Sequence, residues 1–261
     1  MPTFAANLTF LFHELPFLDR FQAARETGFR YVEHAFPYDT APEEIQKRLK
    51  QTGLNMVLIN LPPGNLTVGE LGLAADPDRM DEFRRGVEQA LEYARLLGVS
   101  RLNCLAGRRR EEVPLADQFR VLVENMRYAA GRMAAHGLLM TTEPLNTYDV
   151  PGFLLSTSTA ALGLMDEVGA LNLKLQYDLY HMQKMEGNLT ETLRRHISRI
   201  GHIQMADNPG RLPPGAGEIN FPFLLGEIDR IGYQGYVGVE YFALPDTRSS
   251  LAWIKNWGFS L

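Results

Sequence analysis

Strand-like and helix-like segments alternate along the whole of this chain, and the alternation limits the folds that it can adopt. The strand-like runs cover residues 3–8, 30–35, 54–60, 99–105, 138–143, 171–177, 200–204 and 235–240. The helix-like runs cover residues 16–27, 42–51, 78–97, 115–135, 158–168, 189–196, 221–231 and 246–257. Strict alternation implies a parallel sheet, and eight units at a spacing of about 30 residues predict a closed α/β barrel of the (β/α)8 TIM type.

The length of the chain agrees with that fold. It has 261 residues, close to the roughly 250 typical of such barrels, so we expect one domain over residues 1–261. Apolar residues make up 45% and charged residues 22%, a globular composition. The structural alternative is an open doubly wound sheet. Such a sheet usually carries a glycine-rich fingerprint after its first strand, whereas here the first strand is followed by TFLFHELP.

Charge, cysteine content and hydropathy limit the partners and the compartment that we expect for this protein. The net charge of −5 gives no basic field for a phosphate backbone, so no nucleic-acid partner is expected. The lone Cys104 cannot form an internal disulfide and is interpreted as a small buried residue, which fits a reducing compartment. No signal peptide or apolar run of about 18 residues is present, so we predict a cytoplasmic protein without membrane contact. The sequence leaves open whether it forms homo-oligomers.

Four strand-like runs end in a side chain that carries oxygen. These are Glu143, Asp178, Gln204 and Glu240. In a closed barrel the carboxyl ends of the strands lie on one face, so these four side chains should converge on one pocket. Three carboxylates in a dry pocket must take up protons or bind a cation, because like charges repel strongly. The sequence therefore predicts a divalent metal site, with unrelated polar strand ends as the alternative.

The predicted ligands all bind through oxygen, which favours a hard cation. We expect one Mg²⁺, with Mn²⁺ or Co²⁺ as substitutes, in preference to zinc, which favours nitrogen and sulfur. An octahedral ion held by four protein oxygens keeps two positions for substrate or water. That arrangement suits Lewis-acid catalysis.

Several motifs together resemble those of the hydroxypyruvate isomerase family. They are FAANL, EPLN at Glu143, DLYHMQ at Asp178, HIQMADNPGR at Gln204, GEIN at Glu218 and GYQGYVGVEY at Glu240, and the match runs from Phe4 to about Tyr241. This family is a branch of the xylose-isomerase-like TIM barrels, which also include 2-oxo-tetronate isomerases and ketose 3-epimerases. By resemblance, Glu143, Asp178, Gln204 and Glu240 are metal ligands, and Glu143 and Glu240 are also the catalytic acid and base. Related epimerases generally have histidine at the position of Gln204, so this position favours the isomerases.

The expected reaction interconverts a small 2-keto-3-hydroxy acid and its aldehyde isomer, as between hydroxypyruvate and tartronate semialdehyde. It moves a proton between adjacent carbons through an enediolate. Two carboxylates on opposite sides of the substrate can remove and return the protons, and we assign this to Glu143 and Glu240.

Two further residues are predicted to bind substrate. His181 lies three residues after Asp178 and can hydrogen-bond a substrate oxygen, and Arg211 lies in a Gly- and Pro-rich loop where its guanidinium can bind a carboxylate. The family pattern EPLNTRD appears here as EPLNTYD, with Tyr148 at the place of the arginine. This departure leaves open a 2-oxo-tetronate isomerase or a ketose 3-epimerase.

Two hypotheses from other classes remain. One is a metal-dependent phosphodiesterase acting on DNA, for which the negative net charge and Gln204 in place of histidine are unfavourable. The other is a non-catalytic protein that binds sugar acids. It would leave the presence of both Glu143 and Glu240 unexplained.

Overall fold

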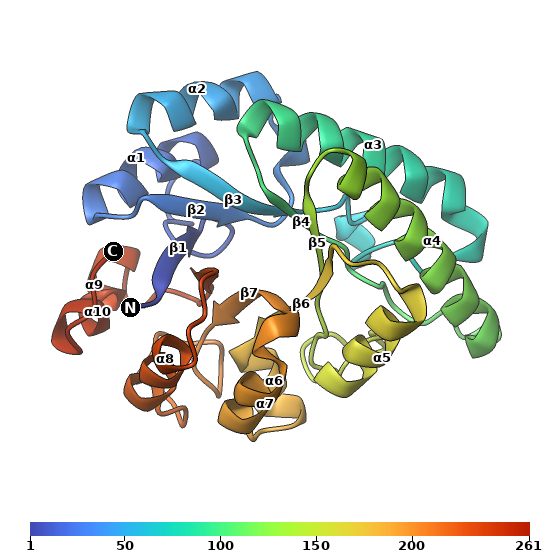
Figure 1. The fold of residues 1–261 in the computed structure, drawn as a ribbon. Helices are drawn as coiled ribbons and strands as arrows, with labels where there is room; N and C mark the ends of the chain where they lie inside the picture. The colour runs from blue at the N-terminus through green and yellow to red at the C-terminus, as the bar shows by residue number, and fades with distance from the viewer.

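The computed structural model describes residues 1–261 and contains a closed barrel of eight parallel strands in sequential order. Figure 1 shows the strands at the centre, with helices around them and the two termini close together. The strands are β1 (Thr3–Asn7), β2 (Tyr31–His34), β3 (Asn55–Asn60), β4 (Arg101–Asn103), β5 (Leu139–Thr142), β6 (Leu173–Asp178), β7 (Ile200–Met205) and β8 (Tyr236–Val239). β8 pairs with β1, which closes the sheet. The predicted barrel is confirmed.

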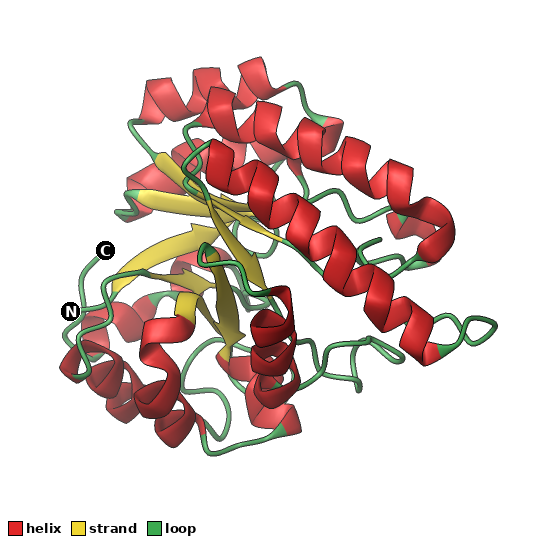
Figure 2. Ribbon diagram, turned by 45° about the vertical axis from the view of Figure 1, so that its right-hand side comes forward, coloured by secondary structure: helices red, strands yellow, loops and turns green.

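The helices alternate with the strands, largely as predicted. They are α1 (Phe17–Thr27), α2 (Pro42–Thr52), α3 (Met80–Leu97), α4 (Leu115–Ala135), α5 (Ser158–Val168), α6 (Leu179–Met185), α7 (Leu189–His196), α8 (Phe221–Arg230), α9 (Thr247–Ser250) and α10 (Ala252–Asn256). Each apolar helix face packs against the sheet, and Figure 2 shows the helices enclosing the strands. No helix combines the length and the apolar character needed to cross a bilayer.

Three sequence predictions are wrong in detail. The single final helix predicted over residues 246–257 is two short helices, α9 and α10, separated by Leu251. A short helix, α6, begins directly after Asp178, although the sequence predicted no helix there. The sixth strand begins at Leu173, and Leu171, which was assigned to it, is 95% exposed in the preceding turn.

Closure of the barrel buries both faces of every strand. In β6 the apolar residues Leu173, Leu175 and Tyr177 belong to the hydrophobic core, while Gln176 is also buried. Because successive side chains point to opposite faces, Gln176 and Asp178 of β6 face the barrel interior instead of solvent. The lumen therefore carries buried polar groups that need partners inside the barrel.

Candidate active site

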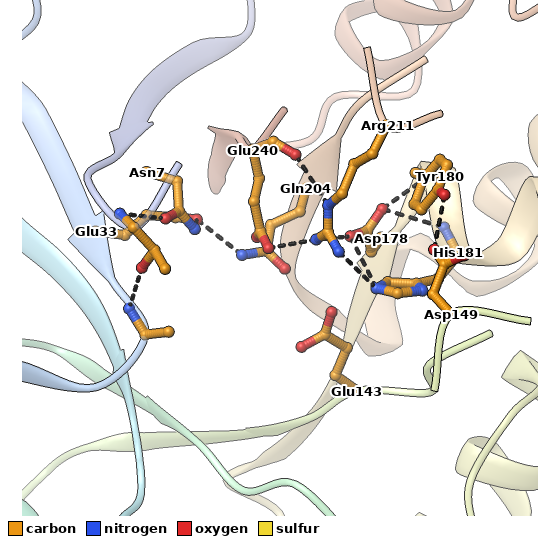
Figure 3. A network of polar contacts seen from close by, with 12 residues as sticks. Asn7, Glu33, Glu143, Asp149, Asp178, Tyr180, His181, Gln204, Arg211 and Glu240 are labelled. Atoms are coloured by element: carbon orange, nitrogen blue, oxygen red, sulfur yellow. Dashed lines mark hydrogen bonds and ion pairs between the residues drawn. The ribbon is translucent and has the colours of Figure 1, made fainter. Parts of the chain in front are cut away.

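The four strand-end residues lie at the carboxyl ends of neighbouring strands. Glu143 directly follows β5, Asp178 ends β6, Gln204 lies near the end of β7 and Glu240 directly follows β8. All four are buried, with exposed fractions of 8% or less, and Asp178 and Gln204 are paired in the sheet register. Figure 3 shows these side chains around one pocket. The structure thus brings together the residues that the sequence singled out.

The two carboxylate oxygens of Asp178 have different partners. It is the N-cap of α6, where Oδ1 accepts the backbone N–H of Tyr180 at 2.7 Å and that of His181 at 3.3 Å. Its other oxygen, Oδ2, lies 3.3 Å from Arg211 and 3.7 Å from Nε2 of His181. The helix cap therefore fixes the carboxylate so that one oxygen faces the pocket.

His181 is held as a hydrogen-bond donor to the pocket. Its Nδ1 accepts the backbone N–H of Asn146 at 3.0 Å, so the neutral ring carries its proton on Nε2. Burial lowers the pKa of His181 to about 4, which keeps the ring neutral near pH 7. Nε2 lies 3.7 Å from Oδ2 of Asp178 and 3.4 Å from Nη1 of Arg211. Because a guanidinium can only donate hydrogen bonds, Arg211 must move aside when Nε2 donates to another group. This geometry suits a contact with substrate oxygen, and a protonated Nε2 cannot bind a metal.

Arg211 lies between two of the carboxylates. Its guanidinium pairs with Oε1 of Glu240 and with Oδ2 of Asp178, and its Cζ lies 4.5 Å from the centre of the Phe10 ring. Burial lowers the pKa of Arg211, but the charges of Glu240 and Asp178 outweigh burial and hold that pKa above its usual value. A buried cation therefore already neutralises part of the carboxylate cluster.

The loop that carries Arg211 is held by a buried carboxylate that the sequence reading did not single out. Oδ2 of Asp207 accepts the backbone N–H groups of Gly215 and Gly217, and Oδ1 accepts that of Ile219. Arg211 itself has a φ of 56°, which is uncommon outside glycine. Glu218 accepts a hydrogen bond from Asn208 within the same loop at 2.6 Å, which helps to hold the loop.

The two glutamates have strongly perturbed acidities. Burial raises the pKa of Glu143 well above its usual value, and the charges of Glu240 and Asp178 raise it further. Burial also raises the pKa of Glu240 to about 8, although Arg211 opposes the rise. A carboxyl group with a pKa of about 8, such as that of Glu240, can both take and give protons near neutral pH, as a general acid or base must.

Buried amides support the carboxylates from inside the barrel. Oε2 of Glu143 accepts hydrogen bonds from Asn103 at 3.0 Å and from Gln176 at 2.9 Å. Gln176 also donates to Oε1 of Gln204 at 2.6 Å. The sequence reading missed Asn103 and Gln176. The signal that marks them is a neutral amide that alternates with buried leucines along the strand, Leu102 in β4 and Leu175 in β6.

The donor groups of the pocket fit a hard divalent cation. Atoms of Glu143, Asp178 and His181 lie within 4.8 Å of one another, a separation that one ion can bridge. The proton on Nε2 removes His181 from that set, which leaves carboxylate oxygens. Burial and neighbouring carboxylates raise the pKa of both Glu143 and Glu240, so the charged forms of these side chains are disfavoured in the substrate-free protein. A bound cation would place positive charge beside them and favour the charged forms.

Tyr148 lies outside the pocket. Its side chain is 74% exposed, and Nζ of Lys184 lies 5.5 Å from the centre of its ring. The neighbouring Asp149 accepts hydrogen bonds from Tyr180 and Lys184 at 2.7 Å, although its side chain is 37% exposed. The departure from the family pattern at position 148 therefore falls on the surface, beside the site but not within it.

Comparison with known proteins places this geometry in a family. Residues 21–257 match the family described as xylose isomerase-like TIM barrel. The chain belongs to this family. It is 46% identical to the hydroxypyruvate isomerase of Escherichia coli over 257 residues, covering 98% of this chain and all of that one. It is 43% identical to the 2-oxo-tetronate isomerase of Cupriavidus necator, covering 98% and 99% of the two chains. These similarities confirm the resemblance inferred from the motifs and the prediction of an isomerase.

Solved structures agree with the fold. A Brucella melitensis protein titled AP endonuclease, family 2, superposes with a TM-score of 0.95 at 42% identity, covering 98% of this chain and 99% of that one. The D-psicose 3-epimerase of Clostridium cellulolyticum superposes with a TM-score of 0.76 at 20% identity, covering 96% and 88%. The second similarity concerns the barrel fold alone.

Proposed function

We propose that this protein is a single-domain isomerase that interconverts a small 2-keto-3-hydroxy acid and its aldehyde isomer, as between hydroxypyruvate and tartronate semialdehyde. The observation that carries the proposal is the pair of buried glutamates, Glu143 and Glu240, at the carboxyl ends of β5 and β8; burial raises the pKa of both side chains, to about 8 for Glu240. The full-length similarity to a hydroxypyruvate isomerase supports the substrate class.

Arg211 and His181 bind and orient the substrate in this proposal. The guanidinium of Arg211 gives up part of its contact with Asp178 and Glu240 and pairs with the substrate carboxylate. Its planar group can form two parallel hydrogen bonds with a carboxylate. The Nε2–H of His181, fixed by the Asn146 backbone, donates to a substrate oxygen. These two contacts hold the reacting carbons between Glu143 and Glu240 and restrict the substrate to one orientation.

The reaction moves protons between neighbouring carbons. One glutamate removes the proton from the hydroxyl-bearing carbon, which leaves an enediolate, and the other delivers a proton to the adjacent carbon. A proton also passes from the hydroxyl oxygen to the former keto oxygen, so the atoms of the substrate are conserved. Each acid or base contributes roughly 10²- to 10⁴-fold to the rate.

We assign Glu143, Asp178, Gln204 and Glu240 as the residues that hold the cation, with Mg²⁺ as the first choice and Mn²⁺ or Co²⁺ as substitutes. When bound, the cation would supply positive charge beside the two oxygens of the enediolate. The oxygen donors of these side chains support this assignment, and so does the position of the Arg211 guanidinium, which shows that the carboxylates attract a cation.

A 2-oxo-tetronate isomerase is the second candidate, supported by the 43% identity to the Cupriavidus necator enzyme. The two candidates share the proton chemistry and differ in substrate length. Ketose 3-epimerization has weaker support because Gln204 replaces the histidine expected in epimerases. The net charge of −5 is unfavourable for a phosphodiesterase acting on DNA.

An isomerisation assay separates these activities. The protein is incubated with hydroxypyruvate, a 2-oxo-tetronate and a ketose, each with Mg²⁺, Mn²⁺ or Co²⁺ and after chelation. We expect turnover of a keto acid that is lost with the chelator and restored by a metal. Turnover of the ketose alone, or full activity after exhaustive chelation, would contradict the proposal.

A further inference from the structure

A buried carboxylate lies next to one of the proposed cation ligands, Gln204. Glu33, in β2, is fully buried, and its Oε2 lies 2.7 Å from Nε2 of His202. Its Oε1 accepts hydrogen bonds from Asn7 at 2.9 Å and from Gln204 at 2.8 Å. Figure 3 shows Glu33 beside Asn7 and Gln204, on the side away from Glu143. The proposed mechanism uses none of these contacts except through Gln204.

Glu33 accepts hydrogen bonds only. The side-chain oxygen of Asn7 accepts the backbone N–H of Thr9 at 2.9 Å, so the amide nitrogen of Asn7 must face Glu33. The Nδ1 of His202 is buried without a partner, so the ring proton belongs on Nε2, which faces the carboxylate. With donors on both oxygens, Glu33 has no acceptor for a proton of its own and is a carboxylate.

This carboxylate decides which way the Gln204 amide points. An amide has one face that donates and one that accepts, and only the nitrogen of Gln204 can pair with Glu33. The oxygen of Gln204 must then point away from Glu33, toward Gln176 and the site. The opposite orientation would place an amide N–H beside the cation and an oxygen against the carboxylate.

We infer that Glu33 is a positioning residue that holds the Gln204 amide oxygen toward the cation site. The inference rests on the proposed function, in which Gln204 is a ligand. Metal ligands are commonly oriented by hydrogen bonds from residues behind them, and loss of such a partner weakens affinity about 10- to 100-fold.

The absence of a side chain at Gly238 in β8 leaves space for the Glu33 carboxylate. A methyl group placed on Gly238 would lie 2.3 Å from Oε1 of Glu33, closer than real contacts allow. Gly238 is paired in register with Gln204 on the neighbouring strand. Glycine at this position therefore permits the contact between Glu33 and Gln204, and alanine should displace it without changing any charge.

The test measures Mn²⁺ binding to the metal-free protein by calorimetry, without substrate. Glu33→Gln should weaken Mn²⁺ binding by about tenfold or more, because its amide can donate to the oxygen of Gln204 and turn it from the site. The double variant Glu33→Gln/Gln204→Glu exchanges carboxylate and amide while conserving charge and size. It should bind Mn²⁺ within about threefold of the wild type, because a carboxylate presents an oxygen in either orientation.

Gly238→Ala is the second route to the same displacement and should weaken Mn²⁺ binding without changing charge. Circular dichroism and thermal unfolding identify variants that fail to fold. If Glu33→Gln fails to fold, Gly238→Ala and the charge-conserving double variant decide the question.

The outcomes are distinguishable. If the wild type binds Mn²⁺ and folded Glu33→Gln or Gly238→Ala binds it equally well, the positioning role is wrong and the proposed function stands. A double variant that binds tenfold more weakly than the wild type also overturns the positioning role. If the wild type binds no divalent metal, both the inference and the proposed cation site are wrong.

Discussion

Removing Arg211 should have opposite effects on metal and on substrate. In the substrate-free protein the guanidinium contacts Asp178 and Glu240, the same oxygens that the cation needs. A cation must therefore displace at least one of these contacts, whereas in Arg211→Gln the oxygens are free. The variant should bind metal more tightly and substrate more weakly.

The magnitude follows from the contacts that are exchanged. A hydrogen bond to a charged group contributes about 1.5–3 kcal/mol. Loss of one such contact on metal binding in the wild type corresponds to about a 10- to 100-fold difference in Kd. We expect Arg211→Gln to bind Mn²⁺ more tightly by that factor, while KM for the keto acid rises because its carboxylate has lost its partner.

The assay is calorimetric titration of the metal-free protein with Mn²⁺, followed by kinetics at saturating metal. Arg230→Gln is the matched control, because it makes the same change of charge at a salt bridge with Glu227 outside the site. It should bind Mn²⁺ like the wild type. Equal or weaker binding by Arg211→Gln would refute the view that this arginine competes with the cation.

Three further predictions concern the carboxylates. Asp178→Asn should weaken metal binding at least tenfold while the helix cap and the thermal stability persist, because the amide oxygen can still accept the N–H of Tyr180; unchanged affinity in calorimetry would contradict this. Glu240→Gln should lower turnover about 10²-fold or more and weaken metal binding less steeply, which steady-state kinetics and calorimetry compare directly. Because the pKa of Glu240 is raised to about 8, a proton must leave before it can bind metal below that pH. Metal affinity should therefore increase from pH 6 to about 8 with release of protons, and affinity that is constant over this range would count against the assignment.

The fold was predictable because each strand and helix is marked locally. Apolar runs separated by Gly stops define the units, and only a closed barrel accommodates eight of them in this order. The helix α6 was missed because its first residues, Leu179 to His181, follow Asp178 without a turn signal. An aspartate that ends a strand and caps a helix at once looks like the end of the strand alone.

The ring of strand ends was predictable for a related reason. The carboxyl ends of parallel strands lie on one face of the barrel, so Glu143 and Glu240 must lie on the same face whatever the details of packing. The contact between Glu33 and Gln204 could not be predicted in this way, because it joins residues 171 positions apart across the lumen. Their distance depends on closure of the barrel, and a single buried glutamate in an apolar strand does not reveal its partner.

The pairing of Arg211 with Asp178 and Glu240 also could not be predicted from the sequence. The motif indicated a guanidinium over the pocket, but its contacts depend on how Asp207 folds the loop. At Tyr148 the sequence suggested a role in the site that the structure does not support. A departure from the family pattern suggested a changed substrate, and only the structure shows that the side chain is 74% exposed.

The most direct test of the proton-transfer mechanism uses deuterated water. If Glu143 and Glu240 exchange protons with solvent through an enediolate, product formed in deuterated water should carry deuterium on the carbon that receives the proton. Mass spectrometry of product collected at low conversion measures this label. Product with deuterium at that carbon is the predicted result. Product without deuterium would indicate direct hydride transfer and would contradict the roles of both glutamates, even if each proves essential for metal binding.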